Sequence, residues 1–198
     1  MSVQTRHFVD VAAKAQELGC RVPVGVALLP GNLSTAAHSG EFCYHAATPQ
    51  VRSAWQRIGL EDEGPAAAGG DMAHSTRSVI LSESNESKNL FARSGQAQSA
   101  SIGIVSQADT PAESAKLPLV VFFGAGLLDG SAWRVTVALG MVSSVFASLA
   151  RRTGQRDVRL DVVVERPGDR GYACIEYRGD AFGIVALARD VRRVWTGK

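Results

Sequence analysis

The chain has 198 residues, of which 45% are hydrophobic and 20% are charged, and its formal net charge is +2. This composition is typical of a globular protein that buries one sizeable core. The near-neutral charge gives no basic face for phosphates, and 7% aromatic residues are too few for a base-stacking platform. We therefore expect no nucleic-acid partner.

The cysteines and the N-terminal segment indicate a soluble cytoplasmic protein with reduced thiols. Cys20, Cys43 and Cys174 are far apart and odd in number, whereas a disulfide framework has a denser, even set. Residues 1–7 lack the basic start and apolar core of a signal peptide. The uncharged run 135–150 is shorter than the roughly 20 residues that a bilayer requires, so we expect no membrane partner.

The first part of the chain predicts a helix, a strand and a second helix. Apolar residues at three- and four-residue spacing predict a helix over 5–18, with Thr5 as its N-cap. Residues 22–29 form an apolar run that is typical of a strand. A Thr-Pro pair then begins a helix over 48–58, because proline is favoured in the first helical turn.

Residues 61–116 are predicted to be a polar insertion. Gly, Ala, Pro, Ser and other polar residues dominate the segment, so it can bury little apolar surface. Two short strand candidates, 78–81 and 101–105, would pair as a long hairpin. The composition favours disorder for the rest of the insertion.

The segment 117–152 organises the predicted fold. Residues 117–123 are apolar, with β-branched and aromatic side chains, and fit a strand that is covered on both faces. A glycine-containing turn over 124–130 precedes a helix candidate over 131–152. This helix is apolar over most of its circumference, which predicts burial on most of its sides.

The last part of the chain predicts two strands and a helix. Apolar and polar residues alternate over 157–165, as in a half-buried strand, and a second strand is expected over 172–178. The intervening Pro-Gly-Asp sequence predicts a hairpin loop. Asp180 is the expected N-cap of the final helix.

These elements predict a single α/β or α+β domain over residues 1–198. Its fold would be a single mixed sheet with flanking helices and a central buried helix, plus the polar, partly disordered insertion 61–116. The strands 117–123 and 157–165 would be parallel, joined by the helix 131–152 in one crossover. The hairpin would add an antiparallel strand to the same sheet.

The glycine-containing turn is one candidate ligand-binding site, with Gly124, Gly126, Asp129 and Ser131 as its residues. A turn between a buried strand and a helix is where backbone N–H groups and the helix dipole converge on ligands. The glycine pattern is incomplete, and the segment lacks the lysine of a phosphate-binding loop. A purely structural turn is therefore the favoured interpretation.

The loop 34–47 contains the densest group of reactive side chains, including His38, Glu41, Cys43 and His45. Cys43 and His45 are the candidate catalytic pair, because a nearby imidazole lowers the pKa of a nucleophilic thiol. The spacing matches no established set of metal ligands, so we predict no metal site. The sequence implies no particular cofactor, and an ordinary surface loop is the favoured alternative.

Four carboxylates gather around the C-terminal hairpin: Asp161, Glu165, Glu176 and Asp180. Paired carboxylates can bind a metal ion, but a strand places only alternate residues on one face. We therefore do not favour a metal site here.

Two functions remain open, because no motif assigns the chain to a family. The preferred one is a non-enzymatic cytoplasmic interaction or accessory module that binds a protein partner or assembles as a homo-oligomer. The alternative is a small thiol- or metal-dependent hydrolase with its site on the loop 38–45, near the turn 124–131. Finding both segments at the same end of the sheet would favour the alternative.

Overall fold

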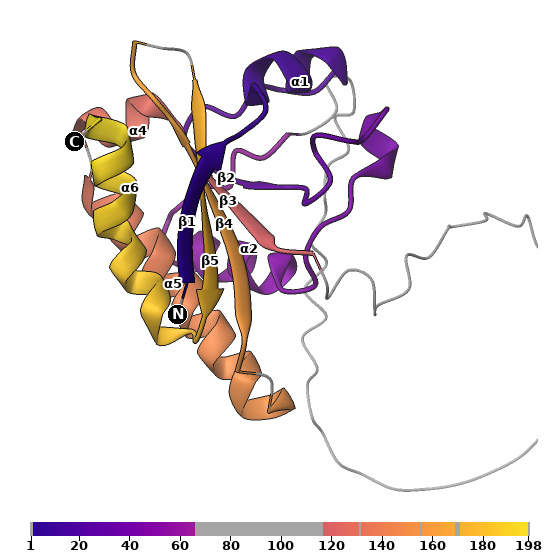
Figure 1. Ribbon diagram of the computed structural model, residues 1–198. Coiled ribbons are helices and arrows are strands. Elements are labelled where there is room, and N and C mark those ends of the chain that lie inside the picture. The colour runs from indigo at the N-terminus through magenta and orange to yellow at the C-terminus, as the bar shows by residue number, and fades with distance from the viewer. Residues whose placement is uncertain (1, 66–116, 131, 155, 169–170, 198) are drawn as a thin grey trace, which may run out of the picture. The chain divides into compact units, whose positions relative to one another are not determined.

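The computed structural model describes residues 2–65, 117–130, 132–154, 156–168 and 171–197 (Figure 1). Within these residues it contains a five-stranded mixed sheet with the strand order β1-β5-β4-β3-β2. The strands are β1 (Ser2–His7), β2 (Val26–Leu29), β3 (Leu119–Phe123), β4 (Val158–Glu165) and β5 (Tyr172–Gly179). The predicted mixed sheet with flanking helices is confirmed. Most of the predicted insertion, with both of its strand candidates, lies outside the described residues.

The helices are distributed between the strands and after the last one. They are α1 (Val11–Glu17), α2 (Thr48–Arg57), α4 (Ala125–Gly130), α5 (Ala132–Thr153) and α6 (Leu187–Thr196). Two short 3₁₀ turns, η1 (Ser39–Glu41) and η2 (Phe182–Ala186), precede α2 and α6. The turn expected over 124–130 is thus wrong in its conformation, because all but its first residue form the short helix α4.

The centre of the sheet follows the predicted topology. β3 and β4 are parallel, and α4 and α5 make the connection between them. β4 and β5 form an antiparallel hairpin. The edge strands are also antiparallel to their neighbours, β2 to β3 and β1 to β5. The sheet is therefore parallel only where a helix crosses over it, as the geometry of such connections requires.

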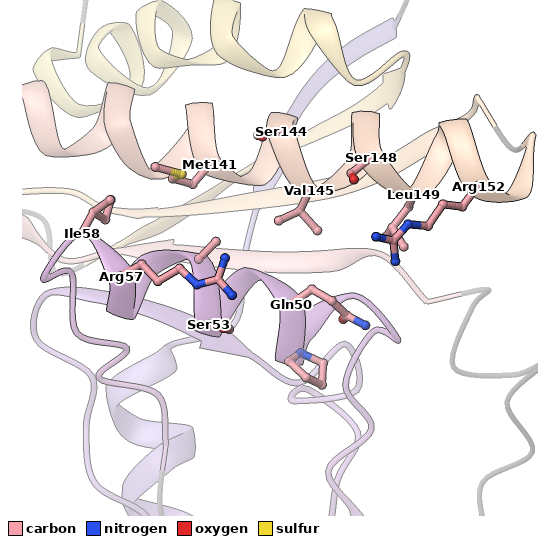
Figure 2. A pocket seen from close by; sticks show the side chains of 12 residues that line it. Gln50, Ser53, Arg57, Ile58, Met141, Ser144, Val145, Ser148, Leu149 and Arg152 are labelled. Atoms are coloured by element: carbon pink, nitrogen blue, oxygen red, sulfur yellow. The ribbon is translucent and has the colours of Figure 1, made fainter. Parts of the chain in front are cut away.

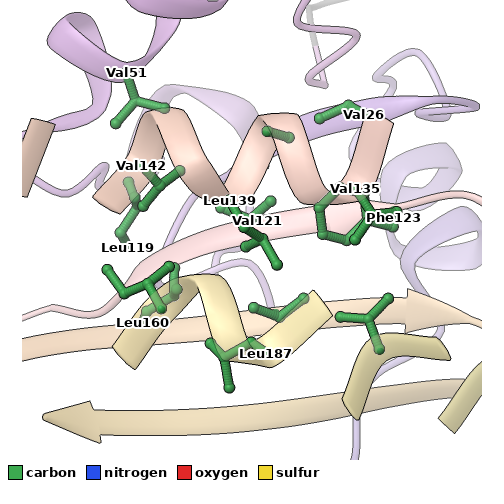
Figure 3. Packing of buried hydrophobic residues seen from close by; sticks show 14 of the residues in the cluster. Val26, Val51, Leu119, Val121, Phe123, Val135, Leu139, Val142, Leu160 and Leu187 are labelled. Atoms are coloured by element: carbon green, nitrogen blue, oxygen red, sulfur yellow. The ribbon is translucent and has the colours of Figure 1, made fainter. Parts of the chain in front are cut away.

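The larger core lies between one face of the sheet and three helices, α2, α5 and α6 (Figure 3). Alternate residues of β3, such as Val121 and Phe123, are fully buried there against Leu139 of α5. Trp55 of α2 is also fully buried and donates its indole N–H to the Ala138 carbonyl, at 3.2 Å. The opposite face carries a smaller core beneath α1. Both faces of β3 are therefore covered, as its uninterrupted apolar sequence predicts.

The N-terminal helix predicted over 5–18 is wrong in its first part. Residues 2–7 form β1, and α1 begins only at Val11. Its cap is Asp10, whose Oδ1 accepts a hydrogen bond from the Ala13 backbone N–H at 2.9 Å. Thr5 instead pairs with Ile175 of β5. Pairing with a strand from the other end of the chain overrides the local helical spacing.

The prediction that the long helix is buried on most sides is also wrong. One side of α5, including Val135, Leu139 and Val142, is fully buried against the sheet. Trp133 on another side is 61% exposed. By length and composition alone, Trp133–Thr153 is apolar enough to span a membrane, and 33% of its most apolar window is buried. α5 is therefore a core helix whose further apolar residues, such as Met141 and Val145, pack against that core and stay partly exposed among the described residues.

Candidate functional site

The candidate catalytic residues Cys43 and His45 lie in the segment between η1 and α2. The Cys43 backbone is held beside the end of β2, because its carbonyl accepts from Gly31 N–H at 2.8 Å. The Cys43 thiol donates to the Glu41 carbonyl at 3.3 Å. The imidazole of His45 contacts the Phe146 ring of α5, and its Nδ1 accepts from the Ala47 N–H at 2.9 Å. Burial lowers the pKa of His45, which therefore stays neutral at neutral pH.

The two other candidate ligands of this loop bond to each other. His38 Nε2 lies 3.1 Å from Glu41 Oε1, and Glu41 Oε2 accepts from the Ala37 N–H at 2.8 Å. Across the part of the chain that the structure describes, no group of three or more His, Cys, Asp or Glu side chains is arranged to hold a metal ion.

The glycine-containing segment lies at the other end of β2 from this loop. Gly124 N–H donates to the Gly25 carbonyl, just before β2, whereas Cys43 lies beside Gly31, just after it. A Cβ on Gly124 would lie 1.9 Å from the Val24 carbonyl oxygen, so glycine is required there by close backbone contact. The described parts of loop 38–45 and segment 124–131 therefore do not share one end of the sheet.

The remaining residues of this candidate ligand site fall in or next to α4. Gly126 is exposed, and nothing lies within 4 Å of a Cβ built on it. Asp129 is part of α4, but its side chain is outside the described part of the structure, and Ser131 lies outside the described residues. The Ala125 N–H at the start of α4 is occupied by Glu165 Oε2, at 2.8 Å.

Two of the four C-terminal carboxylates come together. Asp161 of β4 and Glu176 of β5 are directly opposite in the antiparallel register. Arg6 of β1 contacts both, with Nη2 3.5 Å from Asp161 Oδ2 and Nε donating to Glu176 Oε1. Glu165 and Asp180 are separate, since Asp180 Oδ1 accepts from the Gly183 N–H at 2.9 Å.

This three-strand charge cluster (Arg6, Asp161 and Glu176) lies beside a hollow of about 270 Å³. Burial, together with the neighbouring charge of Glu176, raises the pKa of Asp161 to about 6, although Arg6 and Arg178 oppose the shift. Burial also raises the pKa of the adjacent Cys174 thiol to about 12, so this thiol stays protonated. Arg6 contacts both carboxylates without cancelling the cost of burying Asp161, and the cluster links β1 to β4 and β5.

A concave surface lies between α2 and α5, and we call it the α2–α5 groove (Figure 2). Its volume is about 620 Å³, and residues from both helices line it: Pro49, Gln50, Ser53, Ala54, Arg57, Ile58, Met141, Ser144, Val145, Ser148, Leu149 and Arg152. Each helix contributes positions spaced by three and four residues, as one face of a helix does. The two helices run antiparallel, since Ile58 lies near Met141 at one end and Gln50 near Leu149 at the other.

The floor of the groove continues along the whole of α5 as an apolar ridge. The ridge repeats every four residues and consists of Trp133, Val137, Met141, Val145 and Leu149, none of which is fully buried. Its first two residues line a further hollow of about 560 Å³ next to Ile58. Leu149, the last residue of the ridge, borders another hollow of about 840 Å³ near His45. The groove is therefore the middle of a longer, half-exposed apolar surface.

The side chains that line the α2–α5 groove itself carry only positive charge, whereas the hollow at its Ile58 end is mixed, with Arg134, Glu61 and Glu63. The two charged side chains that line the α2–α5 groove are Arg57 and Arg152, at its opposite ends (Figure 2). The adjoining hollow adds Arg156 and Arg159, against one carboxylate, Asp157. The arginines named here are exposed. The α2–α5 groove thus combines an apolar floor with one arginine at each end.

The amino-acid sequence did not predict the α2–α5 groove or the residues that line it. One signal could have revealed them. α5 has apolar residues on more of its circumference than one sheet face can cover, and the four-residue repeat from Trp133 to Leu149 lies apart from the buried stripe that contains Leu139.

No protein-family model, curated protein or solved structure matches this chain.

Proposed function

We propose that this chain is a non-enzymatic binding module whose α2–α5 groove receives a protein partner. The observation that carries the proposal is the apolar ridge of α5, which continues beyond its buried stripe and is left half-exposed beside α2. Large exposed apolar patches with a polar rim are characteristic of protein interaction sites.

The dimensions of the surface favour a macromolecule over a small ligand. From Trp133 to Leu149 the ridge spans 16 helical steps, or about 24 Å at the rise of an α-helix. Small-molecule sites are enclosed and have a few converging polar groups. Here an open groove is continuous with hollows at both of its ends, which share Ile58, Gln50 and Leu149 with it.

The proposal is tested by affinity capture from an extract of the source cells with three forms of the full chain. Ser144 is exposed and lines the groove, so Ser144→Trp fills the groove without burying a polar group. The control is Thr136→Trp, because Thr136 is an exposed residue of α5 that does not line the groove.

We expect at least one protein to be retained by the wild type and by Thr136→Trp and to be depleted severalfold with Ser144→Trp. Light scattering of the purified chain identifies self-association separately. Identical capture by all three forms, or no capture at all, would contradict the proposal.

A further inference from the structure

We infer that the occupant of the α2–α5 groove is an amphipathic helix of another protein, with acidic residues at both ends of its apolar stripe. This inference rests on the proposed function and specifies the chemistry of the partner. It is carried by the shape of the groove and by the distribution of charge around it.

The walls of the groove allow a third helix to approach closely. Ser53 and Ala54 of α2 and Ser144 and Ser148 of α5 line the groove, so both helices contribute small side chains to it. The bulkier Met141, Val145 and Leu149 form a ridge with a four-residue repeat. Such ridges pack into the grooves of a neighbouring helix, and amphipathic helices bind hydrophobic grooves through anchors at this spacing.

The two arginines that line the groove favour a partner with negative charge. Arg57 and Arg152 are separated along the groove axis, and both are exposed, so neither bears an uncompensated buried charge. Arg156 and Arg159 extend the positive region beyond the C-terminal end of α5, where Asp157 is the one opposing carboxylate among the lining residues. Complementary charges across an interface select the partner and increase the association rate.

A second copy of the chain does not provide this complement through its described helices. The exposed positions of α6 include Arg189, Arg192 and Arg193, which would place positive charge against Arg57 and Arg152. α1 has only seven residues, with Lys14 and Glu17 as its charged side chains. The charge pattern therefore selects a different, acidic chain.

The test uses two designed 18-residue helical peptides with the same leucine stripe, one with glutamates at both ends and the other with lysines. Fluorescence anisotropy measures their binding to the full chain in 0.1 M salt. We expect the glutamate peptide to bind about tenfold more tightly than the lysine peptide. The glutamate peptide forms two exposed ion pairs with the groove arginines, where the lysine peptide meets two repulsions. The preference should diminish in 0.5 M salt, because the charges are exposed and screened.

The matched variants reverse charge at one surface at a time. The double variant Arg57→Glu/Arg152→Glu should lose or invert the preference for the glutamate peptide, whereas Arg189→Glu on α6 should retain it. All three sites are exposed, so the folded core is unaffected.

Three other outcomes would overturn the inference that an acidic helix occupies the groove. If neither peptide binds, or both bind equally, while capture still finds a groove-dependent protein, the acidic helix is wrong and the proposed function stands. If the chain sediments with phosphatidylserine vesicles through the same arginines and ignores the peptides, the groove is a lipid site. If the chain dimerises through Ser144, the occupant is a second copy.

Discussion

At the scale of single residues, two glycines of one candidate ligand segment have different environments. Gly124 is buried, and a Cβ there would meet the Val24 carbonyl oxygen at 1.9 Å. Gly126 is exposed within α4 and has open space around it. Gly124→Ala should therefore lower the free energy of unfolding by on the order of 2–3 kcal/mol, since overpacking must displace backbone.

Gly126→Ala is the matched control. It should change the free energy of unfolding by less than about 1 kcal/mol, in the stabilising direction, because alanine is the better helix former. Chemical denaturation of both variants measures the difference. If the two substitutions had equal effects, the role of Gly124 as a close backbone contact would be refuted.

Asp161 gives a prediction about pH. Burial raises its pKa to about 6 in the folded chain, above the usual value of 3.8, so the folded state binds the proton more tightly than the unfolded state. The ionised carboxylate thus destabilises the fold above pH 6, and this cost disappears as the pH falls from about 6 to 4. Asp161→Asn removes the titrating group.

The measurement is the free energy of unfolding of wild type and Asp161→Asn at pH 4.5 and pH 7.5. At pH 7.5 the variant should gain on the order of 2 kcal/mol in the free energy of unfolding relative to the wild type, because the buried charge is removed. The loss of the contact between Asp161 and Arg6 reduces this gain. Asp157→Asn, at an exposed carboxylate, controls for the change in net charge. A difference between wild type and Asp161→Asn that is the same at both pH values would contradict the account.

The prediction of Asp180 as the N-cap of the final helix is wrong, because α6 begins only at Leu187, after Ala186. Asp180 Oδ1 instead accepts from the Gly183 N–H at the start of the 3₁₀ turn η2. The prediction of Thr5 as the first cap is wrong, because residues 2–7 pair with β5 and local spacing carries no trace of that pairing, and Asp10 caps α1 instead.

At the scale of elements, the outer edge of β2 is closed by two carboxylates. Asp62 Oδ1 accepts from Leu28 N–H at 2.8 Å, and Glu63 Oε2 accepts from Gly25 N–H at 3.0 Å. Arg52 of α2 donates to Asp62 Oδ2 at 2.7 Å, and the Asp62 side chain is 5% exposed. Edge strands with unpaired N–H groups promote association, and this arrangement occupies them.

Asp62→Ala should therefore lower the free energy of unfolding by about 2–4 kcal/mol, since it leaves the Leu28 N–H and Arg52 without their partner. It should also accelerate amide exchange at Leu28, which hydrogen exchange detects directly. Glu61→Ala, at the exposed neighbouring carboxylate, should change the stability by no more than about 0.5 kcal/mol. Unchanged protection of Leu28 would show that Asp62 does not close the edge.

Sequence patterns predicted that the α5 segment is a helix and how long the helix is. They did not predict which of its apolar residues line the groove. The hydrophobic positions of a helix do not reveal which of them meet a partner within the domain. Leu139 and Val145 are both apolar, yet Leu139 is fully buried and Val145 is only partly buried at the groove. That distinction depends on where α2 packs, which Trp55 fixes through its contact with Ala138.

At the scale of the whole molecule, the parallel crossover and the hairpin were predictable because their strands follow one another closely in the chain. β3, α5, β4 and β5 are consecutive apart from the short α4. The two edge strands were not placed by the sequence. β1 pairs with β5 across almost the full length of the chain, and β2 pairs with β3 across the segment 66–116. Non-local pairing of this kind leaves no local pattern.

The candidate site was predictable to a smaller extent. The sequence indicated a binding module without giving its surface, because the α2–α5 groove combines residues some 90 positions apart in the chain, such as Ser53 and Ser144. Only the excess of apolar residues around α5 anticipated it.

Site-specific photo-cross-linking tests the central claim most directly. Ser144→benzoylphenylalanine places the reactive group at the groove, and Thr136→benzoylphenylalanine places it on the same helix at an exposed position that does not line the groove. After irradiation in the source cells, we predict one dominant adduct at position 144, mapping to an acidic amphipathic helix, and none at position 136. The same adducts at both positions, or none at position 144, would contradict the account.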